Sequence, residues 1–395
     1  MSPIDNAAGT CCIVDLSALR TNLRTVRRLA GPGVELLAVV KADAYGHGDI
    51  ETARALCAEG VDRLGVATVA EGARLREAGV DAAILVLGSP YPGDAAALVR
   101  HSLDPVVASL DLLRHLDAFG AAHGAEIPCH LKLDTGMGRL GLLPDAVEEW
   151  LPGLDGLKAV RLQGVMSHFA RAEEPESQSC RRQLQVFRRT LKRIRAAGHD
   201  VPLVHMANSA AIMGLPEARF NMVRPGGMLY GIYSHPPLAK LVRLAPVLTW
   251  KTRVLQLKTL PKHSPISYGG TFVTCRESVI ATVPVGYADG YKRSLSNKAA
   301  VLIRGRRAPV VGRVTMDLTM ADVTAIDGVQ PGDEVVLLGT QDGETISAEE
   351  IAGWADTISY EILTSISRGV PRRYIGDNQN GVGRLETVSS DISDT

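Results

Sequence analysis

Lys41 stands where an apolar run, residues 34–40, meets the small, turn-prone stretch 41–48. An apolar run of this length predicts a buried strand, so the sequence places one amine at the mouth of a strand. Partial burial favours the neutral form of an amine, and a neutral lysine is a candidate nucleophile for Schiff-base chemistry. The alternative for Lys41 alone is a surface loop lysine, and the rest of the chain decides between them.

Polar residues also follow four later predicted strands. Each has a simple structural interpretation: His168 as a core histidine, Ser209 as a helix cap and the glycine pair as a turn. However, five predicted strands, including the one before Lys41, end in polar residues of this kind, and this agreement favours a functional site. A hydroxyl and unhindered backbone amides near a helix start also suit a phosphate group. The set comprises Lys132 and Arg139 around the fifth strand, His168 after the sixth, Asn208 and Ser209 after the seventh, and Arg224, Gly226 and Gly227 at the eighth.

These residues need a scaffold that gathers strand ends, and the spacing of apolar runs predicts one. Eight short strands alternate with amphipathic helices in about 200 residues, which is typical of a (β/α)8 TIM-type barrel. A doubly wound open sheet is the alternative, because eight strands do not prove closure. The strands are predicted at 34–40, 63–67, 83–87, 103–108, 127–133, 158–166, 203–206 and 222–224.

After Tyr230 the pattern changes to alternating residues and turn signals, as in 279–285, 300–304 and 333–338. This pattern predicts a mostly-β second domain. We therefore expect an α/β protein with a barrel domain over residues 12–238 and a β domain over residues 239–380. Residues 1–11 could pack with the β domain, and the polar stretch 381–395 is predicted to be a disordered tail.

The bulk composition excludes several classes of function. Lys plus Arg and Asp plus Glu both number 43, and no long run of one sign suggests a nucleic-acid or membrane partner. No stretch is long and apolar enough for a membrane span, and no signal peptide is recognisable, so a cytoplasmic location is expected. The six cysteines lack Cys-x-x-Cys spacing, which argues against a metal site and for reduced thiols.

One glycine motif points in a different direction. Residues 136–141 match the dinucleotide fingerprint G-x-G-x-x-G after a strand. However, position 161, twenty residues on, is Arg rather than the acid that binds the ribose. The glycines also precede Pro144, which looks like the helix start. A nicotinamide or flavin site is therefore not expected here.

Nine segments of the chain together carry a family resemblance: 38–48, 130–141, 166–170, 205–209, 223–226, 267–269, 285–291, 312–317 and 359–361. With them the chain resembles the bacterial alanine racemases, which are fold-type III enzymes that use pyridoxal 5′-phosphate (PLP). The resemblance covers nearly the whole chain, and part of it falls in the β domain, where a barrel-only relative has no counterpart.

The resemblance implies a role for each matching residue. Lys41 would bind PLP covalently and act as one catalytic base, and Tyr268 of a partner subunit would be the second, so the protein would be a homodimer with shared sites. The lysine that matches Lys132 is carbamylated in many relatives. The cofactor would be held by Tyr45, His168, Asn208, Ser209, Arg224, Gly226, Gly227 and Tyr360. The substrate, alanine, would meet Arg139, the backbone at Met316 of the partner subunit, Tyr287 and Asp317. Pro225 and Thr315 depart from the usual pattern, but neither replaces a catalytic group.

The residue types suit racemisation. Inverting a chiral carbon needs two bases on opposite faces of a planar intermediate, and Lys41 with Tyr268 supplies them. An arginine opposite the pyridine nitrogen leaves that nitrogen unprotonated, which weakens the cofactor as an electron sink and suppresses transamination.

The predicted function is interconversion of L- and D-alanine, which supplies D-alanine for peptidoglycan. Alternatives are a serine or broad-specificity racemase, a PLP-dependent decarboxylase and a non-catalytic PLP-binding protein. A decarboxylase would usually place an acid where Arg224 stands, and the non-catalytic protein would lack the segment around Tyr268.

Overall fold

The computed structural model describes residues 9–174 and 177–376. The chain divides into two compact units: one runs from residue 19 to 245, and the other combines residues 9–18 with 246–376. The expected tail, 381–395, lies outside the described residues, as do residues 1–8 of the N-terminal segment. The barrel unit thus begins at residue 19 rather than at 12, because residues 11–15 form a strand of the other unit.

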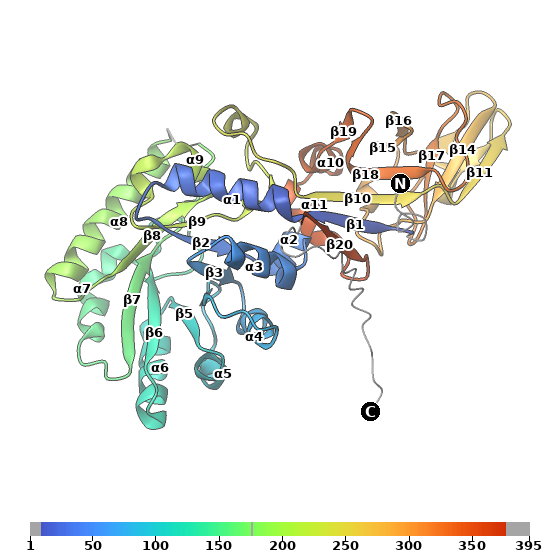
Figure 1. The fold of residues 1–395 in the computed structure, drawn as a ribbon. Helices are drawn as coiled ribbons and strands as arrows, with labels where there is room; N and C mark the ends of the chain where they lie inside the picture. The colour runs from blue at the N-terminus through green and yellow to red at the C-terminus, as the bar shows by residue number, and fades with distance from the viewer. Residues whose placement is uncertain (1–8, 175–176, 377–395) are drawn as a thin grey trace, which may run out of the picture. The chain divides into compact units, whose positions relative to one another are not determined.

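The first unit is a closed barrel of eight parallel strands (Figure 1). Closure excludes the doubly wound open sheet and confirms the predicted fold class. Each strand lies within two residues of a predicted one at either end, because each is a short apolar run between turns. The strands are β2 (Glu35–Val39), β3 (Arg63–Val66), β4 (Ala83–Val86), β5 (Leu103–Val107), β6 (Ile127–Lys132), β7 (Val160–Met166), β8 (Leu203–Asn208) and β9 (Met222–Arg224).

Helices surround the barrel strands (Figure 1). The helix patterns work as expected: Leu19, Leu23 and Val26 are buried on one face of α1, and Phe187 and Ile194 on one face of α8. The helices are α1 (Leu16–Ala30), α2 (Lys41–Gly46), α3 (Asp49–Ala58), α4 (Val69–Glu77), α5 (Ala95–Arg100), α6 (Leu110–His123), α7 (Val147–Trp150), α8 (Gln178–Ala196) and α9 (Ser209–Gly214).

Apolar side chains from the barrel strands fill its interior. Leu37 and Val39 of β2 meet Leu85, Val106, Met166, Leu203 and Met222, all buried. A closed barrel of this size is a packed core rather than a pore. Because all eight strands are parallel, their C-terminal ends share one rim, where the sequence places its polar residues.

The second unit is mostly β, as predicted. Its largest sheet has the order β16-β15-β18-β10-β1-β20, with β19 on β18. Strand β1 is antiparallel to β10 and parallel to β20. The strands are β1 (Cys11–Asp15), β10 (Leu248–Arg253), β11 (Gln256–Leu260), β12 (Pro265–Ile266), β13 (Phe272–Val273), β14 (Ser278–Val283), β15 (Ala300–Ile303), β16 (Arg306–Pro309), β17 (Thr319–Asp322), β18 (Glu334–Gln341), β19 (Glu344–Ile346) and β20 (Arg372–Ile375), with helices α10 (Ala348–Ala355) and α11 (Ser359–Ser365).

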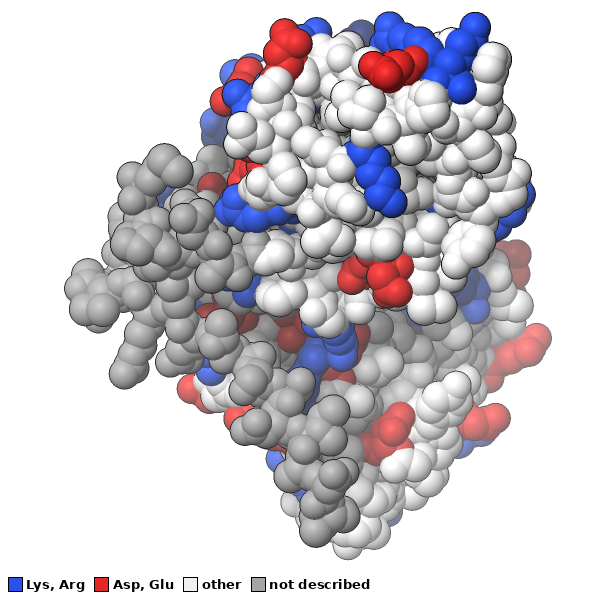
Figure 2. Space-filling model, turned by 90° about the vertical axis from the view of Figure 1, so that its right-hand side faces the viewer, with Lys and Arg blue, Asp and Glu red and all other residues white. Residues whose placement is uncertain are grey.

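The surface carries charges of both signs, as the equal numbers of acidic and basic residues lead one to expect. On the face drawn in Figure 2, basic and acidic side chains are interspersed among neutral ones. In the described part of the chain, no helix combines the length and the apolar character that crossing a membrane requires. All six cysteines are free thiols.

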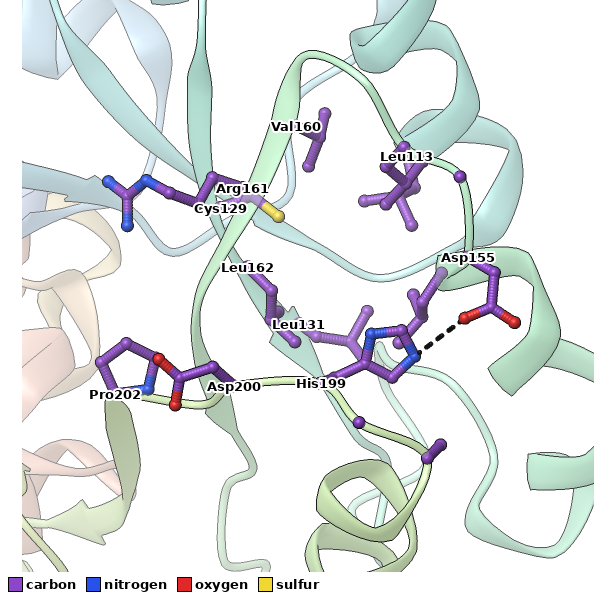
Figure 3. Close-up of a pocket in the computed structure, with 15 residues that line it drawn as sticks. Leu113, Cys129, Leu131, Asp155, Val160, Arg161, Leu162, His199, Asp200 and Pro202 are labelled. Carbon is purple, nitrogen blue, oxygen red and sulfur yellow. Dashed lines mark ion pairs between the residues drawn. The ribbon is translucent and has the colours of Figure 1, made fainter.

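A cavity of about 560 Å³ lies beside strands β6 and β7 (Figure 3). Leucines and Val160 line it together with the ion pair between His199 and Asp155, whose atoms are 3.4 Å apart. None of the residues predicted for the active site lines this cavity. The chemistry must therefore be sought at the rim of the barrel.

Candidate active site

Lys41 follows β2 at the rim, and its amine is partly buried. Burial lowers the pKa of Lys41, and the charges of Arg139 and Arg224 lower it further, whereas Glu71 acts in the opposite sense. These effects increase the neutral fraction of the amine, which is the form that can act as a nucleophile.

The backbone after Lys41 forms a left-handed turn. Residues 42–45 have φ values of 53°, 57°, 51° and 56°, although none of them is glycine. Left-handed backbone costs roughly 1–2 kcal/mol per L-residue, so other contacts must hold the turn. Glu71 supplies one, because its carboxylate accepts from the Ala42 amide at 2.8 Å while also bonding Ala67 and capping α4. Strain of this kind clusters at functional sites.

Arg224, the last residue of β9, is buried with 4% exposure. Its guanidinium donates to Nδ1 of His205 at 3.0 Å and Nδ1 of His168 at 3.2 Å. It also donates to the carbonyls of Ser167 at 2.7 Å and Met206 at 3.0 Å. Burial lowers the pKa of Arg224 to about 9, so the guanidinium still carries its charge at neutral pH. Among the described residues no carboxylate pairs with it.

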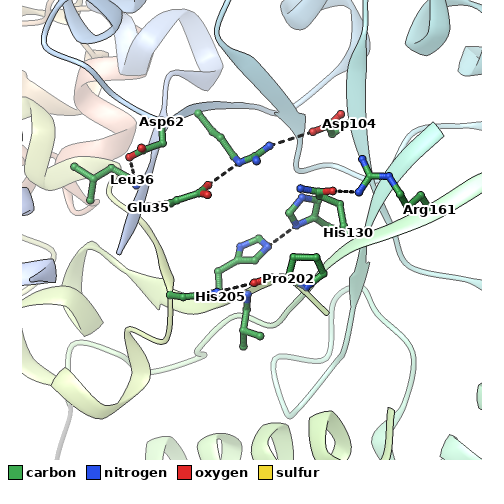
Figure 4. Close-up of polar contacts among 12 residues, drawn as sticks. Glu35, Leu36, Asp62, Asp104, His130, Arg161, Pro202 and His205 are labelled. Carbon is green, nitrogen blue, oxygen red and sulfur yellow. Dashed lines mark hydrogen bonds and ion pairs between the residues drawn. The ribbon is translucent and has the colours of Figure 1, made fainter. Parts of the chain in front are cut away.

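This cation determines the tautomers of three histidines. A guanidinium can only donate, so Nδ1 of His205 and of His168 must accept, and each neutral ring then carries its proton on Nε2. His205 Nε2 lies 2.8 Å from Nδ1 of His130, across the barrel interior (Figure 4), so it donates there. The proton of His130 therefore lies on its own Nε2, which is buried and has no partner among the described residues.

The same surroundings keep these rings neutral. Burial is the main cause of a pKa of about 3 for His130, and Arg63 and Arg224 lower it further. Burial and the charge of Arg224 also hold the pKa values of His168 and His205 well below the ordinary range. Neutral imidazoles can accept from Arg224, whereas imidazolium rings would repel it.

A second group of residues forms a cradle of donors. Ser209 Oγ accepts from the amides of Gly226 at 2.9 Å and Met228 at 3.3 Å, which leaves its own O–H free to donate. The Gly227 amide has no partner among the described residues. A Cβ on Gly226 would come within 2.6 Å of the Tyr45 hydroxyl, so only glycine permits this close approach. Asn208, not Ser209, caps α9, through the Ala211 amide at 3.1 Å.

Lys132 and Arg139 add positive charge near Lys41. Burial, together with Arg139, Arg224 and Lys41, lowers the pKa of Lys132 to about 8, although Asp134 opposes this. The Arg139 guanidinium has no hydrogen bond or ion pair among the described barrel residues. The rim is therefore rich in cations and suits anionic ligands such as a phosphate and a carboxylate.

The remaining predicted residues belong to the second unit. Tyr268 begins a short turn between β12 and β13 and is 71% exposed. Tyr287 and Met316 are also exposed, and their loops are joined by the amides of Tyr287 and Ala288, which donate to Thr315 and Met316. The Met316 amide has no partner among the described residues. Asp317 follows in the same loop, and Tyr360 lies on α11.

Three contributors were missed by sequence reasoning. His130 and His205 lie in matching segments but receive no role from the resemblance, although alternation along β6 and β8 could have placed both inside the barrel. Glu71 had a recognisable signal, because Thr68 and Glu71 have the spacing of a helix capping box. The backbone turn at 42–45 had no such signal.

A closed barrel that gathers a partly neutral lysine, a buried arginine and a donor cradle at the C-terminal ends of its strands is an enzyme of the (β/α)8 class. The alanine racemase N-terminal domain model matches residues 14–234, and the C-terminal domain model matches 247–374. The chain belongs to the alanine racemase family.

Individual relatives support this membership. The alanine racemase of Symbiobacterium thermophilum is 48% identical over 95% of this chain and 99% of its own. That of Halothermothrix orenii is 45% identical over 91% and 95%. The solved alanine racemase of D-cycloserine-producing Streptomyces lavendulae superposes with a TM-score of 0.89 at 37% identity, over 94% of this chain and 98% of that one.

We predict that His130, His168 and His205 stay neutral between pH 5.5 and 8, with the proton on Nε2 in each ring. Nitrogen-15 NMR of histidine-labelled protein reports both features. Unfolded histidines have a pKa of about 6.5, so the unfolded chain takes up more protons below that value and stability should fall as the pH drops below it. Titration of any of the three rings near pH 6.5 would contradict the tautomer assignment.

Proposed function

We propose that this protein interconverts L-alanine and D-alanine with PLP as its cofactor, and so supplies D-alanine for peptidoglycan. The observation that carries the proposal is the buried Arg224, held by neutral acceptors only. An arginine facing the pyridine nitrogen of PLP favours racemisation, whereas the rival decarboxylase would place an acid there. Homodimer formation and a cytoplasmic location remain predictions, and so does the preference for alanine over serine.

The residues of the barrel rim fit PLP. The O–H of Ser209 and the amide of Gly227 offer donors for a phosphate beside Tyr45 and Gly226, with Asn208 at the same helix start. Tyr360 is assigned to the cofactor by the family resemblance alone. Lys41 would bind the cofactor through its amine, and Arg224 and His168 would face its ring. When bound, PLP withdraws electrons from the α-carbon of the amino acid and makes its α-hydrogen acidic.

The protein's own groups would then move the proton. Lys41 would take or return it on one face, and Tyr268 of the partner subunit on the other. His168 carries its proton on Nε2 when Arg224 occupies Nδ1, so it could donate to the Tyr268 oxygen and stabilise its anionic form. Arg139 and the backbone amide of Met316 of the partner subunit would hold the substrate carboxylate. By the same resemblance, Tyr287 would line the entrance and Asp317 would contact the substrate.

The two-base assignment predicts different behaviour for the two enantiomers in Tyr268→Phe. This change keeps the ring and removes only the hydroxyl, so racemisation should fall by at least about 100-fold, as for the loss of a general base. In heavy water the variant should still exchange the α-hydrogen of D-alanine, through Lys41, but exchange that of L-alanine far more slowly.

The control is Tyr91→Phe, which removes the hydroxyl of a strongly exposed tyrosine outside the site and should leave both rates unchanged. Equal loss of exchange for both enantiomers would argue against one base per face. Racemisation near the parental rate would exclude Tyr268 as the second base.

We predict that Lys132 is carbamylated. With a pKa of about 8, roughly one tenth of its amine is neutral at pH 7 and can add carbon dioxide. The product is an anion, which replaces repulsion of Arg139 by attraction. Protein equilibrated with carbon-13 bicarbonate should show a carbamate carbon signal that Lys132→Arg lacks. A parental protein without this signal would refute the assignment.

The shared site predicts complementation between two inactive variants. Lys41→Ala and Tyr268→Phe should each be inactive, but a heterodimer of the two contains one intact site. Equal mixing with free subunit exchange should therefore restore about one quarter of the parental activity, because half of the dimers are mixed and each has one good site. Absence of rescue after demonstrated exchange would count against a site built from two subunits.

A further inference from the structure

The loop between Leu133 and Leu142 contains the glycine motif that resembles a dinucleotide fingerprint. It leaves β6 and closes on itself at its base, where the Leu142 amide donates to the Lys132 carbonyl at 2.8 Å and the Asp134 amide to the Leu142 carbonyl at 3.0 Å. The next element is a short turn that begins at Pro144, so the glycines do not open a helix, as expected. The motif therefore has another purpose in this chain.

The loop is wrapped around one carboxylate. Oδ1 of Asp134 accepts from the amides of Gly136, Met137 and Gly138 at 3.0, 2.9 and 3.0 Å, and Oδ2 accepts from that of Arg139 at 3.0 Å. Consecutive amides that converge on one anion form a nest of the kind that binds phosphates. Partial burial opposes ionisation of Asp134, but these four bonds outweigh it and lower its pKa.

The glycines permit this wrapping. Gly136 and Gly138 have φ values of +132° and +71°, which side chains disfavour. A Cβ on Gly141 would lie 2.5 Å from the Asp134 nitrogen. The G-x-G-x-x-G pattern thus lets the chain enclose an anion of its own rather than a bound nucleotide.

We infer that Asp134 is a positioning residue for substrate binding, because it fixes the loop that presents Arg139. The last amide in the nest belongs to Arg139 itself, so the backbone of this residue is anchored where its side chain begins. The guanidinium lies close enough for its charge to lower the pKa values of Lys41, Lys132 and His168. This inference rests on the proposed role of Arg139 as the partner of the substrate carboxylate.

Anchoring matters in the outer part of the loop, because only the base is held by other contacts, namely its own backbone hydrogen bonds and those of the buried Thr135 with Ser167 and Gln183. Gly136, Gly138, Arg139 and Leu140 are exposed. An arginine on an unanchored loop would have to be ordered at each binding event, and the entropy of ordering would weaken substrate binding. The effect should therefore appear in KM for alanine more than in kcat.

The test compares Asp134→Asn with Asp145→Asn in the full-length enzyme loaded with PLP. The first removes the charge and leaves only one oxygen to accept, whereas the second removes an exposed charge from the turn that follows the loop. We expect Asp134→Asn to raise KM for alanine by about 10-fold while kcat changes by less than about threefold, and Asp145→Asn to change neither. Hydrogen exchange at the amides of 136–139 should accelerate in Asp134→Asn only.

A double-mutant cycle with Arg139→Gln separates positioning from other effects. Asp134 also influences Lys132 directly, and such an effect would persist without Arg139. If Asp134 acts through Arg139, Asp134→Asn should raise KM little further in the Arg139→Gln background. An equal rise in both backgrounds, or a fall confined to kcat, would overturn the inference.

A second variant tests the inference independently, in case Asp134→Asn does not fold. Gly138→Ala keeps the carboxylate and adds a methyl group with no atom within 4 Å, but it strains the backbone at φ +71°. It should raise KM in the same direction, and an unchanged KM with accelerated loop exchange would overturn the inference. Failure of the proposed function is distinguishable, because then the parental enzyme would not racemise alanine, or Arg139→Gln alone would leave KM unchanged.

Discussion

Arg224 is a buried cation that no carboxylate among the described residues neutralises, and its burial constrains the rest of the barrel rim. A buried charge must be hydrogen-bonded on all sides, and Arg224 achieves this with two carbonyls and two imidazoles. Two of those acceptors belong to β8 and two to the residues directly after β7, so β7, β8 and β9, which ends at Arg224, must stay in register. Because Arg224 needs acceptors and an imidazolium ring has none, the two histidines that contact it must be neutral.

The rim has a charge quite unlike that of the whole chain. Lys41, Lys132, Arg139 and Arg224 each affect the pKa of at least one other group there, whereas the chain has no net charge. Glu71 and Asp134, the two acids that raise the pKa values of these lysines, already accept hydrogen bonds from backbone amides. Positive potential is thus available to anionic ligands although the surface as a whole is balanced.

Much of this arrangement was predictable from the sequence, and the reasons are physical. Short apolar runs predict where strands end, and in a parallel barrel those ends share one rim, so Lys41, His168 and Arg224 could be grouped without coordinates. Backbone geometry could not be predicted in the same way. The left-handed turn at 42–45 leaves no pattern in residue type. The glycines of 136–141 are visible in the sequence, but they do not show that the loop encloses Asp134, and the tautomers depend on which nitrogen faces Arg224.

Strand β1 has a consequence for how the protein is made. Its partners β10 and β20 lie more than 200 and 350 residues later in the chain. At roughly 5–20 residues per second, a ribosome needs at least about 10 s to produce β10 after β1 has emerged. During that time β1 is an edge without a partner, which is an aggregation hazard. The barrel, whose residues are contiguous, can be synthesised completely in the interval, so the second unit depends on a strand that must wait for its neighbours.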